Sequence, residues 1–136
     1  MAVLDHIGIA VRSVDERLAV YRALGLEPSG GEEVASQQVR VAFLPLGGTR
    51  IELLEPTAAD SPIAGFIARR GEGVHHLCIG VPDIRAAMAA ARAAGLAVLS
   101  DEPQAGAHGA QVCFVHPRST GGVLIELSQA VAGGRP

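Results

Sequence analysis

Two stretches of the chain, residues 4–26 and 74–96, decide the fold because they repeat each other. Residues 4–26 read LDHIGIAVRSVDERLAVYRALGL, and residues 74–96 read VHHLCIGVPDIRAAMAAARAAGL. At an offset of 70 the identical pairs are His6/His76, Ile9/Ile79, Val11/Val81, Ala19/Ala89, Arg22/Arg92, Ala23/Ala93, Gly25/Gly95 and Leu26/Leu96. Downstream, Ile51-Glu52-Leu53 matches Ile125-Glu126-Leu127. The pattern predicts two copies of one module of about 65 residues.

Each copy is predicted to open with a strand. Along residues 5–11 and 75–81, large apolar side chains alternate with a histidine and small residues. A period of two predicts a strand with one face on a core and the other lining a cavity. Further strands are predicted at roughly 37–44 and 49–55 in the first copy, and at roughly 97–100, 109–116 and 122–128 in the second.

A helix follows each opening strand. Ser13-Val14-Asp15-Glu16 fits a capping box, and Gly25 ends the helix that it begins. In the second copy Asp83 is the expected N-cap and Gly95 the expected end. Ser61-Pro62 begins a short linker helix that reaches Arg70. The order is βαβββ, given twice.

Composition narrows the classes of function. The chain has 136 residues, 49% hydrophobic and 18% charged, with net charge −3. It carries no basic run, so a nucleic-acid partner or an anionic membrane surface is not expected. All eleven basic residues are arginine, which excludes a lysine Schiff base. Cys78 and Cys113 lie in apolar runs, as buried thiols do, and a cytoplasmic location is expected.

Four candidate metal ligands sit at repeated positions. His6 and His76 occupy the same place in the two opening strands, and Glu52 and Glu126 the same place in the two closing strands. A carboxylate embedded in an apolar strand is costly unless it is paired or bound to a metal. If the two modules lie side by side with approximate two-fold symmetry, two imidazoles and two carboxylates converge, which suits a divalent first-row cation.

The other three histidines are assigned lesser roles. His75 has the opposite phase to its neighbour and is expected to be structural or to support the ligands. His108 is expected in a loop, with a place at the rim of the site as the alternative. His116 precedes Pro117 and is expected in a turn.

These modules resemble the vicinal oxygen chelate superfamily, also called the glyoxalase/bleomycin-resistance fold. Particular phrases resemble its methylmalonyl-CoA epimerases, and they cover nearly the whole chain: LDHIGIAV at 4–11, VAFLPLGGTRIELLEP at 41–56, DSPIAGFI at 60–67, GEGVHHLCIGV at 71–81 and GAHG…VCFVHPRSTGGVLIEL at 106–127. The resemblance implies one α+β domain over 1–136, with modules at about 1–58 and 72–130 and a linker helix at about 61–70. The two modules would form a cupped mixed sheet around a metal site.

The resemblance also implies an activity. It gives His6, Glu52, His76 and Glu126 as ligands of a divalent ion, Co²⁺ first, with Mn²⁺, Ni²⁺, Zn²⁺ or Mg²⁺ as alternatives. The implied reaction is epimerisation of (2R)/(2S)-methylmalonyl-CoA, through a metal-stabilised enolate and without a redox cofactor. The implied partners are this acyl-CoA and a second copy of the chain in a homodimer.

Inversion at carbon requires two bases, or one base and a relay. The family pattern makes Glu126 one base. In at least one family version the other is a glutamate on the strand before the first ligand glutamate, but residues 37–41 here read QQVRV. Glu33 is a candidate if its loop folds over, and Arg40 is a candidate for the substrate carboxylate. Ser119 and Thr120 are further candidates for substrate binding, with an ordinary turn as the alternative.

Three other readings share the scaffold. A glyoxalase I-type lactoylglutathione lyase uses the same four-ligand pattern, so the ligands alone do not separate it from an epimerase. An extradiol dioxygenase needs only two histidines and one glutamate, so the presence of a second glutamate, Glu52, argues against this class. A metal-free binding or resistance protein has no use for two such pairs in matched phase.

Overall fold

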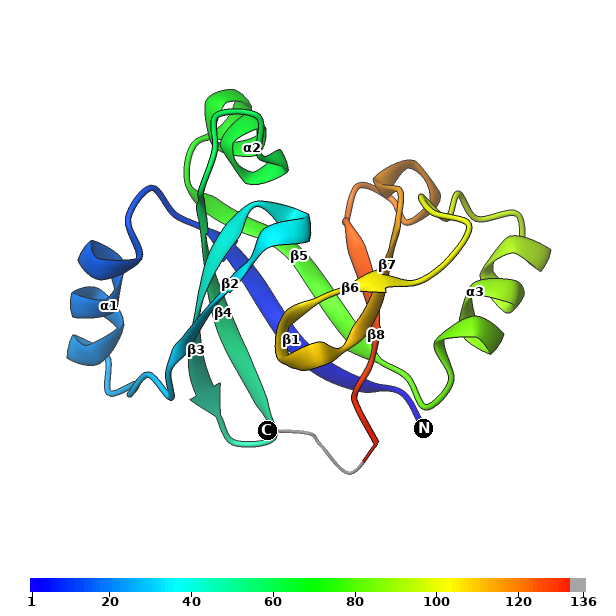
Figure 1. Cartoon of the computed structure of the whole chain (residues 1–136), viewed down its shortest axis with the longest axis horizontal. Coiled ribbons are helices and arrows are strands. Elements are labelled where there is room, and N and C mark those ends of the chain that lie inside the picture. The colour runs from blue at the N-terminus through cyan, green and yellow to red at the C-terminus, as the bar shows by residue number, and fades with distance from the viewer. Residues whose placement is uncertain (133–136) are drawn as a thin grey trace. The chain divides into compact units, whose positions relative to one another are not determined.

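The computed structural model describes residues 1–132 and has an α+β architecture (Figure 1). Over these residues its three α-helices and eight strands run in the order β1 (Val3–Ala10), α1 (Val14–Ala23), β2 (Gly31–Val34), β3 (Val39–Leu46), β4 (Thr49–Pro56), α2 (Pro62–Arg70), β5 (Gly73–Gly80), α3 (Ile84–Ala93), β6 (Gln104–Ala105), β7 (Gln111–Val115) and β8 (Ile125–Gln129). The chain divides into two compact units. The first unit is residues 6–75, and the second is residues 1–5 with residues 76 onward.

In the first unit the strand order is β2-β3-β4-β1. β1 runs parallel to β4, and the other neighbours are antiparallel, so the pairing is mixed. The core lies between one face of these strands and α1, where Val14 packs with Ala42, Leu44 and Leu53. Leu18 and Tyr21 of α1 pack against the same cluster, as their helical spacing predicts.

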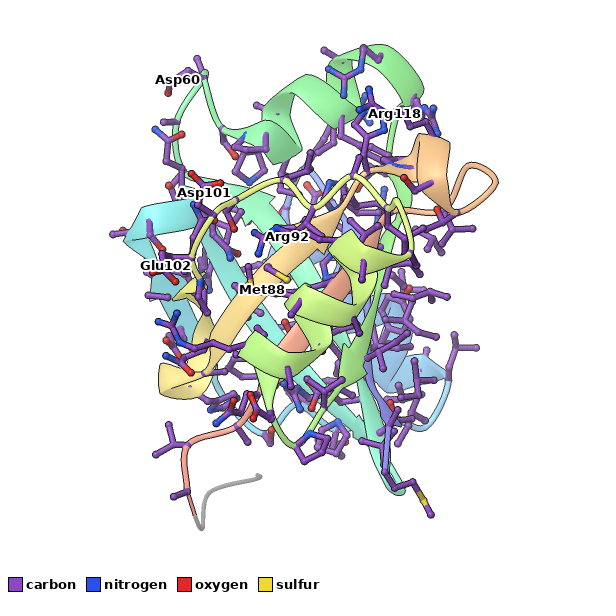
Figure 2. The ribbon with its side chains drawn as sticks, turned by 90° about the vertical axis from the view of Figure 1, so that its right-hand side faces the viewer. Asp60, Met88, Arg92, Asp101, Glu102 and Arg118 are labelled. Carbon is purple, nitrogen blue, oxygen red and sulfur yellow. The ribbon has the colours of Figure 1, made fainter. Side chains whose placement is uncertain are left out.

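The second unit repeats this plan with the order β5-β8-β7-β6. β5 is parallel to β8, and β7 is antiparallel to both of its neighbours. The core lies under α3, where Ile84 and Met88 pack with Cys113 and Leu127. Arg92, on the outer side of α3, donates to the backbone carbonyl oxygens of Ser100 and Asp101 (Figure 2).

The predicted helix signals are confirmed. Ser13 Oγ accepts from the backbone N–H of Glu16 at 3.2 Å, and Asp83 Oδ1 accepts from Ala86 at 3.0 Å. Gly25 and Gly95 follow the two helices at φ values of +94° and +84°, a region that glycine enters without steric cost. α2 begins at Pro62, with Ser61 as its N-cap.

The strand predictions are correct for most of the chain and wrong in three places. Residues 97–100 form no strand, and Val98 makes only an isolated bridge with Val115. β2 and β6 were not expected, because neither has an alternating apolar pattern: β2 carries two charged side chains, and β6 is two residues long. Both pair with a strand that was expected, β3 and β7 respectively.

Among residues 1–132, the structure contains no helix of the length and apolar character needed to cross a membrane.

Candidate active site

The first histidine–glutamate pair is built by the parallel pairing of β1 with β4. Gly8 is the register partner of Glu52, and His6 lies two residues earlier on β1, so both side chains project from the same face. Nδ1 of His6 lies 3.2 Å from Oε2 of Glu52. The two residues are 5% and 3% exposed, so the carboxylate is held out of water and needs a partner there.

The second pair repeats this construction in the second unit. Cys78 is the register partner of Glu126, and His76 lies two residues earlier on β5. Nε2 of His76 lies 2.9 Å from Oε1 of Glu126, and each residue is 5% exposed. In both units the pair lies on the sheet face turned away from the helix-covered core, because the odd-numbered residues of β1 and β5 pack toward that core.

Each pair has the chemistry of half a metal-binding site. A neutral imidazole nitrogen and a carboxylate oxygen are ligands that divalent first-row cations accept in proteins. Two buried carboxylates on duplicated strands concentrate negative charge where an apolar strand would otherwise carry none. Each unit therefore carries one candidate pair of metal ligands, a histidine and a glutamate.

Arg50 distinguishes the first pair from the second. It lies two residues before Glu52 on β4, and its Nε and Nη2 lie 2.8 and 2.7 Å from Oε2 of that glutamate. Its guanidinium carbon also stands 5.7 Å from the centre of the Phe43 ring. Leu124 occupies the corresponding position in the second copy. Arg50 was not among the site residues predicted from the sequence, although its spacing of two residues from Glu52 places it on the same face of the strand.

An aromatic ring stands beside each glutamate. Phe43 on β3 is the register partner of Glu52, and Phe114 on β7 is the register partner of Glu126. The Phe114 ring meets the ring of His76 edge to face at 5.8 Å between centroids. The sequence contains the signal for this match, since Val41-Ala42-Phe43 and Val112-Cys113-Phe114 share the pattern V-x-F.

Arg40 lies elsewhere than expected. It is the register partner of both Glu33 and Glu55, which places it on the opposite face of the sheet from Glu52. Its Nη2 donates to Oδ1 of Asp15 at 3.2 Å, and its Nη1 lies 3.9 Å from Oε1 of Glu55. Arg40 was a candidate for binding the substrate carboxylate, and its position corrects that expectation: β3 begins at Val39, and its odd-numbered residues, not Arg40, share the face of Glu52.

Ser119 and Thr120 shape the loop that leads into β8. Oγ of Ser119 accepts from the backbone N–H of Ala97 at 2.9 Å. Oγ1 of Thr120 donates to the carbonyl oxygens of Pro117, at 3.2 Å, and of Val123. Both hydroxyl groups therefore stabilise this turn through hydrogen bonds to the backbone.

The remaining histidines lie outside the two pairs. His75 packs edge to face on Phe66 of α2, with 5.0 Å between ring centroids. His108 lies in the short turn Ala107–Gly109 with a φ of +57°. Nδ1 of His116 accepts from the backbone N–H of Arg118 at 3.0 Å, which confirms the predicted turn at this residue.

Comparison with known proteins identifies the family. Residues 5–114 match the model of the Glyoxalase/Bleomycin resistance protein/Dioxygenase superfamily. The chain belongs to this superfamily. Membership confirms the glyoxalase-type fold that the resemblance implied.

Within the superfamily, several relatives are named as epimerases. The chain is 43% identical over 129 residues to the mitochondrial methylmalonyl-CoA epimerase of Homo sapiens, covering 93% of this chain and 73% of that protein. It is also 43% identical to an ethylmalonyl-CoA/methylmalonyl-CoA epimerase of Cereibacter sphaeroides, covering 96% of that protein. A solved methylmalonyl-CoA epimerase in complex with methylmalonyl-CoA and NH4+ superposes with a TM-score of 0.92 at 40% identity, covering 98% of this chain and 97% of the other.

Proposed function

We propose that this member of the superfamily epimerises methylmalonyl-CoA, interconverting its 2R and 2S forms. The observation that carries the proposal is that each unit holds a buried histidine–glutamate pair on equivalent strands. The chain is also 43% identical to epimerases named for this substrate. The relative that is also named for ethylmalonyl-CoA makes that ester a second substrate to test.

The proposed holder of a divalent metal is the set His6, Glu52, His76 and Glu126. Support comes from the donor chemistry of the two half-sites and from the duplication that produced them. When bound, a cation such as Co²⁺ would supply positive charge next to the thioester oxygen, where negative charge develops during the reaction. Mn²⁺, Ni²⁺, Zn²⁺ and Mg²⁺ are the alternatives.

The proposed catalytic step is proton transfer at the substrate carbon that lies between the thioester and the carboxylate. Glu126 takes that proton on its carboxylate, the C–H bond breaks, and its electron pair is delocalised onto the thioester carbonyl. A proton returned to the opposite face of the planar carbon inverts its configuration. Glu126 is buried beside His76 and Phe114, so its carboxylate is largely out of water and is a stronger base toward the proton on carbon.

Two further parts of the proposal concern substrate and assembly. Ser119 and Thr120 stay candidates for contact with the acyl-CoA, in addition to their place in the turn. A homodimer and a cytoplasmic location, both expected from the sequence, stay predictions.

The test is deuterium exchange. Metal-loaded and metal-stripped protein are incubated with each epimer of methylmalonyl-CoA in heavy water, and the α-carbon is followed by mass and stereochemistry. Metal-dependent exchange with inversion is expected. Absence of exchange in both samples, together with turnover of a glutathione hemithioacetal, would instead establish the glyoxalase I-type activity.

A further inference from the structure

The proposed epimerisation leaves one proton transfer without a residue. Glu126 serves one face of the reacting carbon, and the strand segment 37–41 has no carboxylate to serve the other. We propose that Glu32, on β2, is the second acid–base residue. This inference rests on the proposed function.

Strand register places Glu32 on the same sheet face as the first histidine–glutamate pair. Glu32 is the partner of Val41, and Val41 is in turn the partner of Leu54. Leu54 lies two residues beyond Glu52 on β4, so its side chain projects from the face of Glu52. Side chains of register partners share a face, and Glu32 is therefore on the face that carries His6 and Glu52.

The local backbone holds Glu32 in this position. A Cβ atom built on Gly31 would lie 2.9 Å from the backbone carbonyl oxygen of Val41, too close for any other residue without a shift of the strand. Glycine at this position lets β2 lie close against β3. Glu32 follows directly and is partly buried, whereas Glu33 is exposed.

Besides Glu32 and Glu52, the strand residues of the first unit include two acidic side chains, Glu33 and Glu55. Glu33 and Glu55 lie on the opposite face, as the register partners of Arg40. Among the described strand residues of the first unit, Glu32 is thus the carboxylate on this face besides Glu52.

The proton balance of the step closes without another reactant. Starting from one epimer, the Glu32 carboxylate takes the α-proton, and the electron pair of the C–H bond is delocalised onto the thioester carbonyl. The carboxylic acid form of Glu126 then donates its proton to the opposite face. The reverse direction starts with Glu126 as base and Glu32 as acid, and both groups regain their starting states by exchange with water.

The test compares Glu32→Gln with Glu33→Gln, a neighbour of the same type on the opposite face. Exchange at the α-carbon in heavy water is measured separately from each epimer, with metal content and thermal unfolding recorded for both variants. For Glu32→Gln we expect epimerisation to fall by about 100-fold or more. Exchange should be lost from one epimer and kept from the other, with metal content unchanged. Glu33→Gln should match the parent protein.

The outcomes separate this inference from the proposed function. A parent protein that exchanges neither epimer overturns the proposed function itself, and the role of Glu32 with it. A parent that exchanges both, with Glu32→Gln epimerising normally or losing both exchanges equally, overturns Glu32 alone. If Glu32→Gln unfolds at a lower temperature than the parent protein, Glu32→Asp replaces it in the test, because it keeps the charge and shortens the side chain by one methylene. Slower exchange from one epimer is then expected, and equal slowing of both would contradict the assignment.

Discussion

Oε1 of Glu55 accepts a hydrogen bond from the backbone N–H of Val14 at 2.7 Å, which ties the end of β4 to the first turn of α1. The second unit repeats this contact, where Oε1 of Gln129 accepts from the backbone N–H of Ile84 at 2.9 Å. Each of these residues lies three positions after a candidate ligand glutamate and on the opposite face of its strand. The closing strand of each module thus presents a candidate metal ligand on one face and a residue that caps a helix on the other.

We predict that Glu55→Ala lowers the free energy of unfolding by about 1 to 2 kcal/mol, because the first turn of α1 loses both an acceptor and a favourable negative charge. Glu55→Gln should cost less, since an amide oxygen still accepts, as Gln129 shows in the second unit. Urea denaturation measures both. Equal losses for the two variants would mean that charge, rather than the hydrogen bond, stabilises the helix start.

The duplication is the part of the fold that the sequence reveals most directly. The repeated histidine, the repeated glutamate and the two glycines after the helices are local signals, and the structure places each of them at equivalent positions. The caps at Ser13 and Asp83 were also predictable, because a side-chain oxygen three residues before an N–H is a local arrangement.

Other features depend on strand pairing, which a sequence pattern does not determine. The sheet face on which Arg40 lies depends on the residue at which β3 begins. Gln38, in the left-handed conformation at φ +52°, directly precedes that strand and interrupts the alternation of side chains between the two faces. β2 was missed because its charged residues carry no apolar period, although its register with β3 is regular. The contact between Arg50 and Glu52 was missed because nothing in the second copy repeats it.

Arg50 should stabilise the carboxylate of Glu52 as well as the fold around it. We predict that Arg50→Met lowers the free energy of unfolding by about 1 to 3 kcal/mol, since it leaves a buried carboxylate without its strongest donor. Glu52→Gln should cost less, and the double variant should cost less than the two single changes added together. A double-mutant cycle by denaturant unfolding measures this coupling, and additive losses would contradict it.

Glu72 gives a pH-dependent contribution to stability. Hydrogen bonds from the Arg17 side chain, at 2.8 Å, and from the backbone N–H of Arg12, at 2.9 Å, hold the pKa of Glu72 below its ordinary value of 4.5. A carboxyl whose pKa is lower in the folded state than in the unfolded state stabilises the fold at pH values above its unfolded-state pKa. This stabilisation is lost as the pH falls through the folded-state pKa. Glu72→Gln should therefore reduce stability by about 1 kcal/mol at neutral pH and by progressively less below pH 4.5. A constant difference between the two proteins from pH 7 to pH 3 would contradict this.

Both cysteines should be inert in the folded protein. Cys78 and Cys113 are fully buried, and burial raises the pKa of the Cys113 thiol above its ordinary value, so it stays protonated at neutral pH. We predict that a thiol-reactive dye labels both residues about 100-fold more slowly in the native state than in urea. Rapid labelling of one cysteine under native conditions would show that its strand opens locally.

In the proposed function, the two histidine–glutamate pairs of the duplicated modules bind one divalent ion. The most direct measurement is the stoichiometry of Co²⁺ binding to metal-free protein, by calorimetric titration with elemental analysis, for the parent chain and for His6→Ala and His76→Ala. We predict one ion per chain and a loss of tight binding in both variants, since each removes a ligand of the same ion. Two ions per chain, each lost in a different variant, would contradict it and show that each module binds metal on its own.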